Sequence, residues 1–283
     1  MADASALVTG IAPRAAGGLL TRAVVGAALA MVAIAAVWEG GVAFRALVAT
    51  AVLLMSAEWS VMHGIPRGFR AASLVALAFV AGVTVYVSAA DALIVLASAA
   101  GLLGLFTRGY DRSRAFWIAA GLLYCGLPMV ALLWLRAVPT SGAALTGAVL
   151  VIVWATDIAA YFAGRMIGGP KLAPRISPKK TWAGAVGGIV AAMSLSAVAG
   201  TVQIVRPGEL QWQSIVAFAM VGGLFGAVAV AGDLFESWLK RRAGVKDSGN
   251  LLPGHGGVLD RIDGLVPVAV IAAVLAYTAG WGR

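Results

Sequence analysis

Apolar stretches long enough to cross a lipid bilayer recur along the whole chain, and they constrain its fold more than any other feature. A membrane-spanning helix needs about 20 apolar residues, and its backbone polar groups must be paired within the segment. Nine windows fit this description, near residues 20–38, 42–57, 71–90, 92–107, 115–135, 144–166, 182–204, 213–238 and 264–281. We therefore expect an all-α, polytopic integral membrane protein with about nine transmembrane helices.

The composition supports a membrane protein and bears on its partners. Hydrophobic residues make up 61% of the 283 residues and charged residues only 12%, whereas soluble domains carry about 25% charged residues. The net charge of +9 is typical of loops that face anionic lipid headgroups. Membrane lipid is thus an expected partner, and nucleic acid is not. The lone cysteine, Cys125, lies in an apolar stretch and is predicted to be a small apolar filler.

The basic residues predict the orientation of the chain. With nine spans and an inner N-terminus, all but four of the 21 Lys and Arg residues fall on the inner side. The four on the outer side are Arg45, Arg136, Arg206 and Arg283. Because Lys and Arg accumulate in cytoplasmic loops, we expect the N-terminus and the two long loops, at about 165–181 and 239–263, to be cytoplasmic. We expect a single domain over residues 1–283, with generic apolar spans over 1–143 and the chemistry over 144–283.

The inner end of the eighth predicted span carries the first group of polar residues. Asp233, Glu236, Ser237 and Lys240 are spaced i, i+3, i+4 and i+7, so they share one helix face. An acidic residue at membrane depth is costly and normally faces a cavity or a partner. The alternative is an Asp233–Lys240 or Glu236–Lys240 ion pair that only stabilises the end of the helix.

The loop that follows is rich in glycine and in charged residues. Glycine lets a backbone approach a phosphate closely with its N–H groups pointing inward. Lys246 and Arg261 supply positive charge, and His255 supplies a hydrogen-bond donor. Asp260 and Asp263 lie three residues apart where the ninth helix should begin, and such carboxylates suit Mg²⁺ together with phosphate oxygens. The alternatives are a helix N-cap for Asp263 and a loop hydrogen bond for His255.

A third group lies around the other long loop. Asp157, Tyr161 and Arg165 are spaced i, i+4 and i+8 and share a helix face. The loop after them opens a new helix near Thr181, and helix N-termini attract phosphate. Its polar residues are Lys171, Arg175, Ser177, Lys179, Lys180 and Thr181. A plain positive-inside loop is the alternative.

These motifs together resemble the signature of the phosphatidate cytidylyltransferases, also called CDP-diacylglycerol synthases. The main match runs Ser237-Trp-Leu-Lys240-Arg241-x4-Lys246-Asp247-x-Gly249-x2-Leu252-Pro253-x-His255-Gly256-Gly257-Val-x-Asp260-Arg261-Ile-Asp263. Gly232–Glu236 and Ile176–Trp182 also resemble motifs of that family. The resemblance is strong over 150–265 and only general before it. This chain departs from the family pattern at Ala183, where the family usually has Glu.

The resemblance implies a reaction in phospholipid biosynthesis. CTP and phosphatidate would give CDP-diacylglycerol and pyrophosphate, with Mg²⁺ as cofactor in a paired-metal centre whose second ion could be monovalent. It implies the inner membrane of a bacterium as the location, and a homodimer is a further expectation. No cysteine or Ser-His-Asp set demands a covalent intermediate, so we expect direct transfer.

The candidate residues fall into three roles. Expected catalytic residues are Asp233, Lys240, Lys246, Asp247, His255, Asp260 and Arg261. Expected substrate-binding residues are Asp157, Arg165, Ser177, Lys179, Lys180, Thr181, Ser237, Arg241, Gly256 and Gly257. Expected metal ligands are Asp233, Asp260 and Asp263.

Three other functions compete with this one. An enzyme that uses CTP on another lipid, such as a polyprenol, would share the chemistry. A transporter would line a path at the bilayer midplane and often repeats its two halves, whereas here the polar residues gather at one membrane face and no halves repeat. A structural scaffold leaves the acidic and glycine spacing unexplained.

The sorting of basic residues predicts the topology directly. Reporter fusions or cysteine labelling should place residues 170–180 and 245–260 in the cytoplasm and Arg283 outside. If the two long loops were labelled from opposite sides, both the nine-span topology and a shared site would be wrong.

Overall fold

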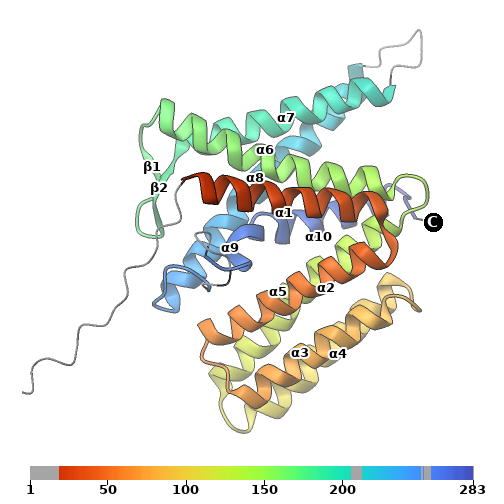
Figure 1. Cartoon of the computed structure of the whole chain (residues 1–283), viewed down its shortest axis with the longest axis vertical. Coiled ribbons are helices and arrows are strands. Elements are labelled where there is room, and N and C mark those ends of the chain that lie inside the picture. Colours follow the sequence, from red (N-terminus) through yellow and green to blue (C-terminus); the bar gives the residue numbers. More distant parts are fainter. Residues whose placement is uncertain (1–18, 205–211, 250, 252–255, 283) are drawn as a thin grey trace, which may run out of the picture.

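The computed structural model describes residues 19–204, 212–249, 251 and 256–282, and helices dominate it (Figure 1). The helices are α1 (Leu19–Glu39), α2 (Gly41–Met62), α3 (Arg67–Val83), α4 (Ala89–Arg108), α5 (Arg112–Ala137), α6 (Gly142–Met166), α7 (Trp182–Ile204), α8 (Trp212–Arg242), α9 (Leu259–Ile262) and α10 (Leu265–Thr278). Two strands, β1 (Lys171–Ala173) and β2 (Ser177–Thr181), lie between α6 and α7.

Each of the nine apolar windows corresponds to a helix, namely α1 to α8 and α10. Within the described residues, six helices are long and apolar enough to cross a membrane: α2, α4, α5, α6, α7 and α8. The apolar parts of α1 and α10 that qualify are shorter, Val24–Glu39 and Leu265–Thr278. The expectation of a helical integral membrane protein is supported, and the count of nine crossings stays a prediction.

The strands are a feature that the sequence analysis treats as part of a loop, so the fold is not purely helical. They pair as an antiparallel hairpin, with Lys171 opposite Thr181 and Ala173 opposite Ser177. Pro178 lacks an N–H and is tolerated because each strand of a two-stranded hairpin has a free edge. The N–H of Trp182 donates to the carbonyl of Pro170 at 3.1 Å, which joins the hairpin to the start of α7.

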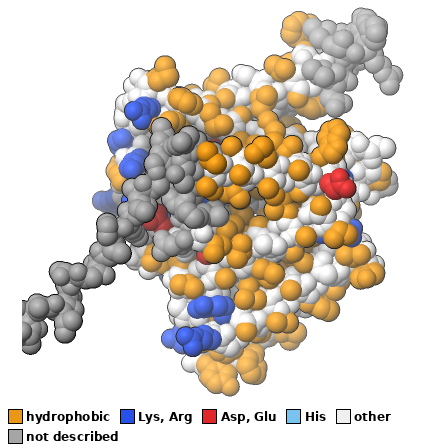
Figure 2. Space-filling view, viewed as in Figure 1, with side chains coloured by type: hydrophobic (Ala, Val, Ile, Leu, Met, Phe, Trp, Pro, Cys, Tyr) orange, Lys and Arg blue, Asp and Glu red, His pale blue; other side chains and the backbone are white. Residues whose placement is uncertain are grey.

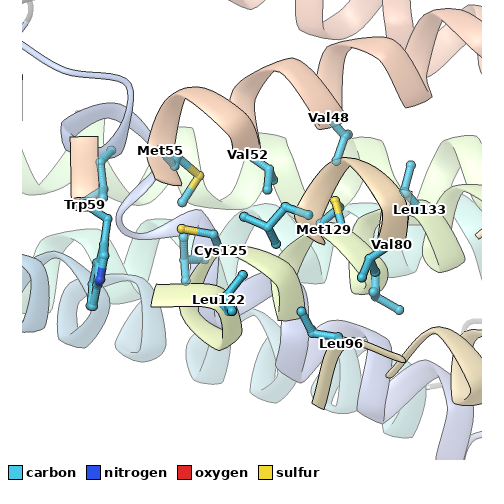
Figure 3. Packing of buried hydrophobic residues seen from close by; sticks show 14 of the residues in the cluster. Val48, Val52, Met55, Trp59, Val80, Leu96, Leu122, Cys125, Met129 and Leu133 are labelled. Atoms are coloured by element: carbon cyan, nitrogen blue, oxygen red, sulfur yellow. The ribbon is translucent and has the colours of Figure 1, made fainter. Parts of the chain in front are cut away.

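Helix α5 occupies the centre of the bundle and contacts α2, α3, α4, α6 and α10. In Figure 1, α6, α7 and α8 lie together on one side of it, and α3 and α4 lie on the other. A buried cluster joins α2 to α5, with Met55, Leu96 and Met129 among its members (Figure 3). Cys125 is fully buried there, as its predicted role as an apolar filler requires. Leu239 and Leu259 extend the same cluster to the end of α8 and to α9.

The loops predicted to be cytoplasmic meet at one end of the bundle. The guanidinium of Arg242 lies 5.4 Å from the ring centre of Trp117 and 5.5 Å from that of Trp238, so the ends of α5 and α8 are adjacent. Arg241 Nε donates to the carbonyl of Ile176 at 3.3 Å, which brings in the hairpin loop. At the other end, Arg136 Nε donates to the carbonyl of Val37 at 2.6 Å. Lys and Arg side chains are visible mainly along the first end in Figure 2, and hydrophobic side chains cover much of the remaining surface.

Glycines bring α6 and α7 close together beside the hairpin. A Cβ at Gly184 would lie 2.7 Å from the carbonyl oxygen of Ala160, and one at Gly188 would lie 2.8 Å from that of Thr156. Small residues at such positions let the backbones of membrane helices approach closely. The contact fixes α6 against α7 and therefore holds the side chains of both helices in register.

This packing predicts opposite effects for one substitution at two helical glycines. Gly188→Ala should destabilise the protein by about 1–3 kcal/mol, as overpacking does, although alanine favours helix by about 1 kcal/mol over glycine. Gly147→Ala is the matched control, because a Cβ there meets nothing within 4 Å, and it should leave stability unchanged or raise it. Thermal unfolding in detergent measures both. Equal melting temperatures for the two variants would contradict the close α6–α7 contact.

Candidate active site

A cavity of about 620 Å³ opens at the end of the bundle where the two long loops meet. It lies between α6, the hairpin, the start of α7, α8 and the segment around α9. Many of the predicted site residues line it: Asp157, Arg165, Lys179, Lys180, Thr181, Asp233, Lys240, Asp247, Asp260, Arg261 and Asp263. Residues from three sequence motifs, more than 100 positions apart at the extremes, therefore face one space.

An ion pair between Lys180 and Asp233 joins the hairpin to α8 across this cavity. Lys180 is near the end of β2, and Asp233 lies where α8 approaches the loops. Helix spacing offers Lys240 as a partner for Asp233, but the partner of Asp233 comes from another motif instead. A lysine and a carboxylate held side by side offer both a phosphate-binding group and a cation-binding group.

Lys240 lies between two carboxylates. Its ammonium forms ion pairs with Glu236, one turn earlier on α8, and with Asp260 Oδ1 at 2.6 Å. Glu236 is fully buried, and the side chain of Lys240 is only 12% exposed. The predicted Glu236–Lys240 pair is therefore present, but it is one half of a network that reaches α9. A buried charge without such a partner would be strongly destabilising.

Asp260 holds the glycine-rich loop in place. Its carboxylate accepts hydrogen bonds from the N–H of Ser248 at 3.0 Å and from that of Gly257 at 2.8 Å. Burial alone would raise the pKa of Asp260, but the hydrogen bonds from Lys240 and Gly257 outweigh it and lower the pKa. Gly256 has φ +82°, and a Cβ there would stand 2.6 Å from the Asp260 carboxylate. Glycine is thus required at position 256 both by the backbone conformation and by space.

Asp263 lies at the junction of α9 and α10. Burial, together with the negative charges of Asp233 and Glu236, raises the pKa of Asp263 well above its usual range. Its Oδ1 accepts from the neighbouring N–H of Gly264 at 2.7 Å, and Gly264 occupies the N-cap position of α10. The N-cap alternative for Asp263 is therefore not the arrangement observed, and its carboxyl group instead faces the cavity.

The α6 and α7 sides of the cavity supply further polar groups. Arg165 Nη1 donates to the Tyr161 hydroxyl at 3.0 Å, so the predicted shared face of these two residues is present. Thr181 Oγ1 accepts from the N–H of Gly184 at 3.1 Å and caps the first turn of α7. The threonine thereby orders the end of β2 next to Lys179 and Lys180.

Six other predicted site residues that the structure describes do not line the cavity. Arg241 donates to the carbonyls of Ile176 and Val245, so it links the two loops. Ser177, Ser237, Lys246, Gly256 and Gly257 are also absent from the lining. His255 lies outside the described residues. The roles assigned to these residues stay predictions.

Glu58 of α2 is a residue of this region that the sequence analysis does not single out. It is 8% exposed, and its carboxylate contacts the glycine-rich loop through three hydrogen bonds. A signal was present, because a lone acidic residue inside an apolar helix is costly and normally has a partner. The spacing of motifs in the second half of the chain gives no indication of it.

The carboxylates can be tested against the expected metal. Within the described part of the chain, no three His, Cys, Asp or Glu side chains form a group that could hold an ion by themselves. Mg²⁺ usually binds one or two carboxylates together with waters and substrate phosphates rather than a complete protein cage. Asp157, Asp233 and Asp263 line the same cavity. This donor set fits such an ion.

Comparison with known proteins gives a consistent result. The sequence profile of the Cytidylyltransferase family matches residues 20–279. The chain is 39% identical over 263 residues to a phosphatidate cytidylyltransferase of Brucella suis, covering 93% of each chain. It is 36% identical over 256 residues to one of Pseudomonas aeruginosa, covering 85% of this chain and 90% of the relative. Because the profile spans the membrane helices as well as the loops that build the cavity, the chain belongs to the cytidylyltransferase family.

Proposed function

We propose that the protein is a phosphatidate cytidylyltransferase, which transfers the CMP group of CTP to phosphatidate and releases pyrophosphate. The observation that carries this proposal is a cavity at the end of an apolar bundle where Lys180–Asp233 and Lys240–Asp260 meet. The relatives that bear this name match nearly the whole chain. A cavity at a membrane face suits a reaction between a water-soluble nucleotide and a lipid phosphate.

The reaction exchanges one phosphoanhydride bond for another. A phosphate oxygen of phosphatidate bonds to the α-phosphorus of CTP, and the bond from that phosphorus to the oxygen bridging to the β-phosphate breaks, so pyrophosphate leaves. Both substrates are anionic, so positioning and neutralisation of charge dominate the catalysis of phosphoryl transfer. Lys179, Lys180 and Arg261 are placed to hold phosphate oxygens in this cavity. Lys240, fixed by Glu236 and Asp260, keeps a positive charge at its base.

Asp233 and Asp263, with Asp157 near them, are the residues that would hold Mg²⁺. When bound, the ion supplies Lewis-acid stabilisation of charge on phosphate oxygens. Asp260 is assigned to the same centre by the sequence analysis, and its contacts with Lys240, Ser248 and Gly257 give it a second role in shaping the loop. The cytoplasmic orientation of the cavity, the bacterial inner membrane and a homodimer belong to the same proposal.

An assay of the purified protein tests this function. With labelled CTP, phosphatidate in detergent micelles and Mg²⁺, we expect labelled CDP-diacylglycerol and stoichiometric pyrophosphate. A polyprenol offered instead of phosphatidate should give no labelled lipid. Asp233→Asn should abolish turnover while the protein remains inserted and extractable. Transfer to the polyprenol alone, or normal turnover by Asp233→Asn, would contradict the assignment of substrate or of site.

The hairpin lysine provides a second prediction, which separates charge from geometry. Lys180→Gln should lower the rate on the order of 10²-fold, the loss expected when a preorganised donor to a charged transition state is removed. Lys180→Arg keeps the charge but replaces a compact ammonium by a planar fork, and it should be clearly impaired because Lys180 is fitted against Asp233.

The matched control is Lys171→Gln in the partner strand of the hairpin. Lys171 is exposed and does not line the cavity, so its loss should leave the initial rates near wild type. If Lys171→Gln and Lys180→Gln were equally active at matched protein levels, the hairpin would be only a positive-inside loop.

A further inference from the structure

Glu58 is remote in sequence from every residue assigned to the site, yet both of its carboxylate oxygens are engaged there. Oε1 accepts from the N–H of Val258 at 2.9 Å. Oε2 accepts from the N–H of Leu259 and from the hydroxyl of Ser248, each at 2.9 Å. The two N–H groups belong to the entry of α9, and the first N–H groups of a helix have no partner within it. Glu58 therefore supplies acceptors that the glycine-rich loop lacks.

The loop backbone packs directly onto this carboxylate. A Cβ at Gly249 would stand 2.9 Å from Glu58 Oε1, and one at Gly257 would overlap both the carboxylate and the Ser248 hydroxyl. Two glycines of the signature are thus explained by the close approach of the loop to Glu58. This explanation for the two glycines does not require that either of them contacts a substrate.

The contacts continue from Glu58 to the cavity. Ser248 donates its hydroxyl to Glu58 and its backbone N–H to Asp260. Leu259 donates its N–H to Glu58 and immediately precedes Asp260 in α9. Asp260 then receives the ammonium of Lys240. A shift of the loop relative to α2 would consequently move both Asp260 and Lys240.

We propose that Glu58 is a positioning residue, which anchors the glycine-rich loop and α9 to α2 and thereby sets Asp260 and Lys240 in the cavity. The proposal rests on the function proposed for that cavity. A carboxylate is required because three donors converge on two oxygens. The amide of glutamine has one acceptor oxygen and adds two N–H groups, so it must turn a donor toward at least one of the loop's donors.

Kinetics and hydrogen exchange of detergent-purified, full-length variants test the role. Glu58→Gln should lower kcat on the order of 10²-fold, as misplacement of catalytic groups by about 1 Å does, with smaller changes in KM for CTP and phosphatidate. Amides of residues 256–262 should exchange faster, while those of α3 and α4 keep their protection. Glu58→Asp keeps both oxygens and should recover part of the loss in kcat.

Two further variants make the test specific. Glu39→Gln is the matched control, because Glu39 is exposed at the end of α1 and its loss should change neither readout. Ser248→Ala removes one of the three donors and should give a smaller loss of kcat with the same local rise in exchange. If Glu58→Gln cannot be purified in folded form, Ser248→Ala tests the anchoring role of Glu58 in its place.

Two results would overturn the proposal. The first is a kcat and a hydrogen-exchange rate equal to wild type in Glu58→Gln. If Glu58→Gln cannot be purified, the same result in Ser248→Ala would overturn the proposal. The second is faster exchange throughout α2 to α5 with no recovery by Glu58→Asp, which would make Glu58 a general stabiliser of the bundle. Hydrogen exchange is measured without substrate, so it tests the anchoring contact independently of the reaction. If the wild-type protein were inactive on phosphatidate, the proposed function would be refuted, and the exchange data would still test the role of Glu58.

Discussion

The structure depends on how a few charges are paired at the end of an otherwise apolar bundle. Lys240 is nearly buried and lies between Glu236 on its own helix and Asp260 on α9. A buried charge is tolerated only with a partner of opposite charge and further hydrogen bonds. If α9 moved away from α8, Lys240 would therefore lose its ion pair with Asp260 while remaining nearly buried. Asp260 in turn binds the N–H groups of Ser248 and Gly257. The buried ammonium of Lys240 is thus linked, through Asp260, to the backbone at both described ends of the glycine-rich loop.

The helices of the first half of the chain also support the residues around the cavity. Its helices form the cluster that includes Met55, Leu122 and Met129 (Figure 3). Leu259 of α9 belongs to the same cluster. Glu58 extends the same helix α2 to the loop by hydrogen bonds. Apolar burial and a buried carboxylate therefore act together at one point, where α2 meets α9. The side chains that line the cavity come from the second half, and the contacts of Glu58 with Ser248, Val258 and Leu259 join that half to the first.

The sequence predicted the helices and much of the site because both are encoded locally. Apolar length alone located α1 to α8 and α10, and helix spacing placed Asp233 and Lys240 on one face. What local patterns cannot give is the identity of a distant partner. Lys180 and Asp233 are separated by a whole helical hairpin, and Glu58 and Ser248 by most of the chain. The β1–β2 hairpin was missed because its strands are short and polar, and their pairing with each other was not encoded in any apolar alternation.

The charges around the cavity explain why a cation is expected in addition to the lysines. The described lining contains five carboxyl groups and five basic side chains: Asp157, Asp233, Asp247, Asp260 and Asp263, and Arg165, Lys179, Lys180, Lys240 and Arg261. Carboxylates that pair with these basic side chains compete with the phosphates of CTP and phosphatidate for them. Lys240 is already shared by two carboxylates and Lys180 is paired with Asp233. Under the proposed function, a Lys180 that turned toward a phosphate would leave Asp233 without its positive partner, and a bound Mg²⁺ would supply a positive charge there. Substrate binding and metal binding are therefore expected to be coupled through this one ion pair.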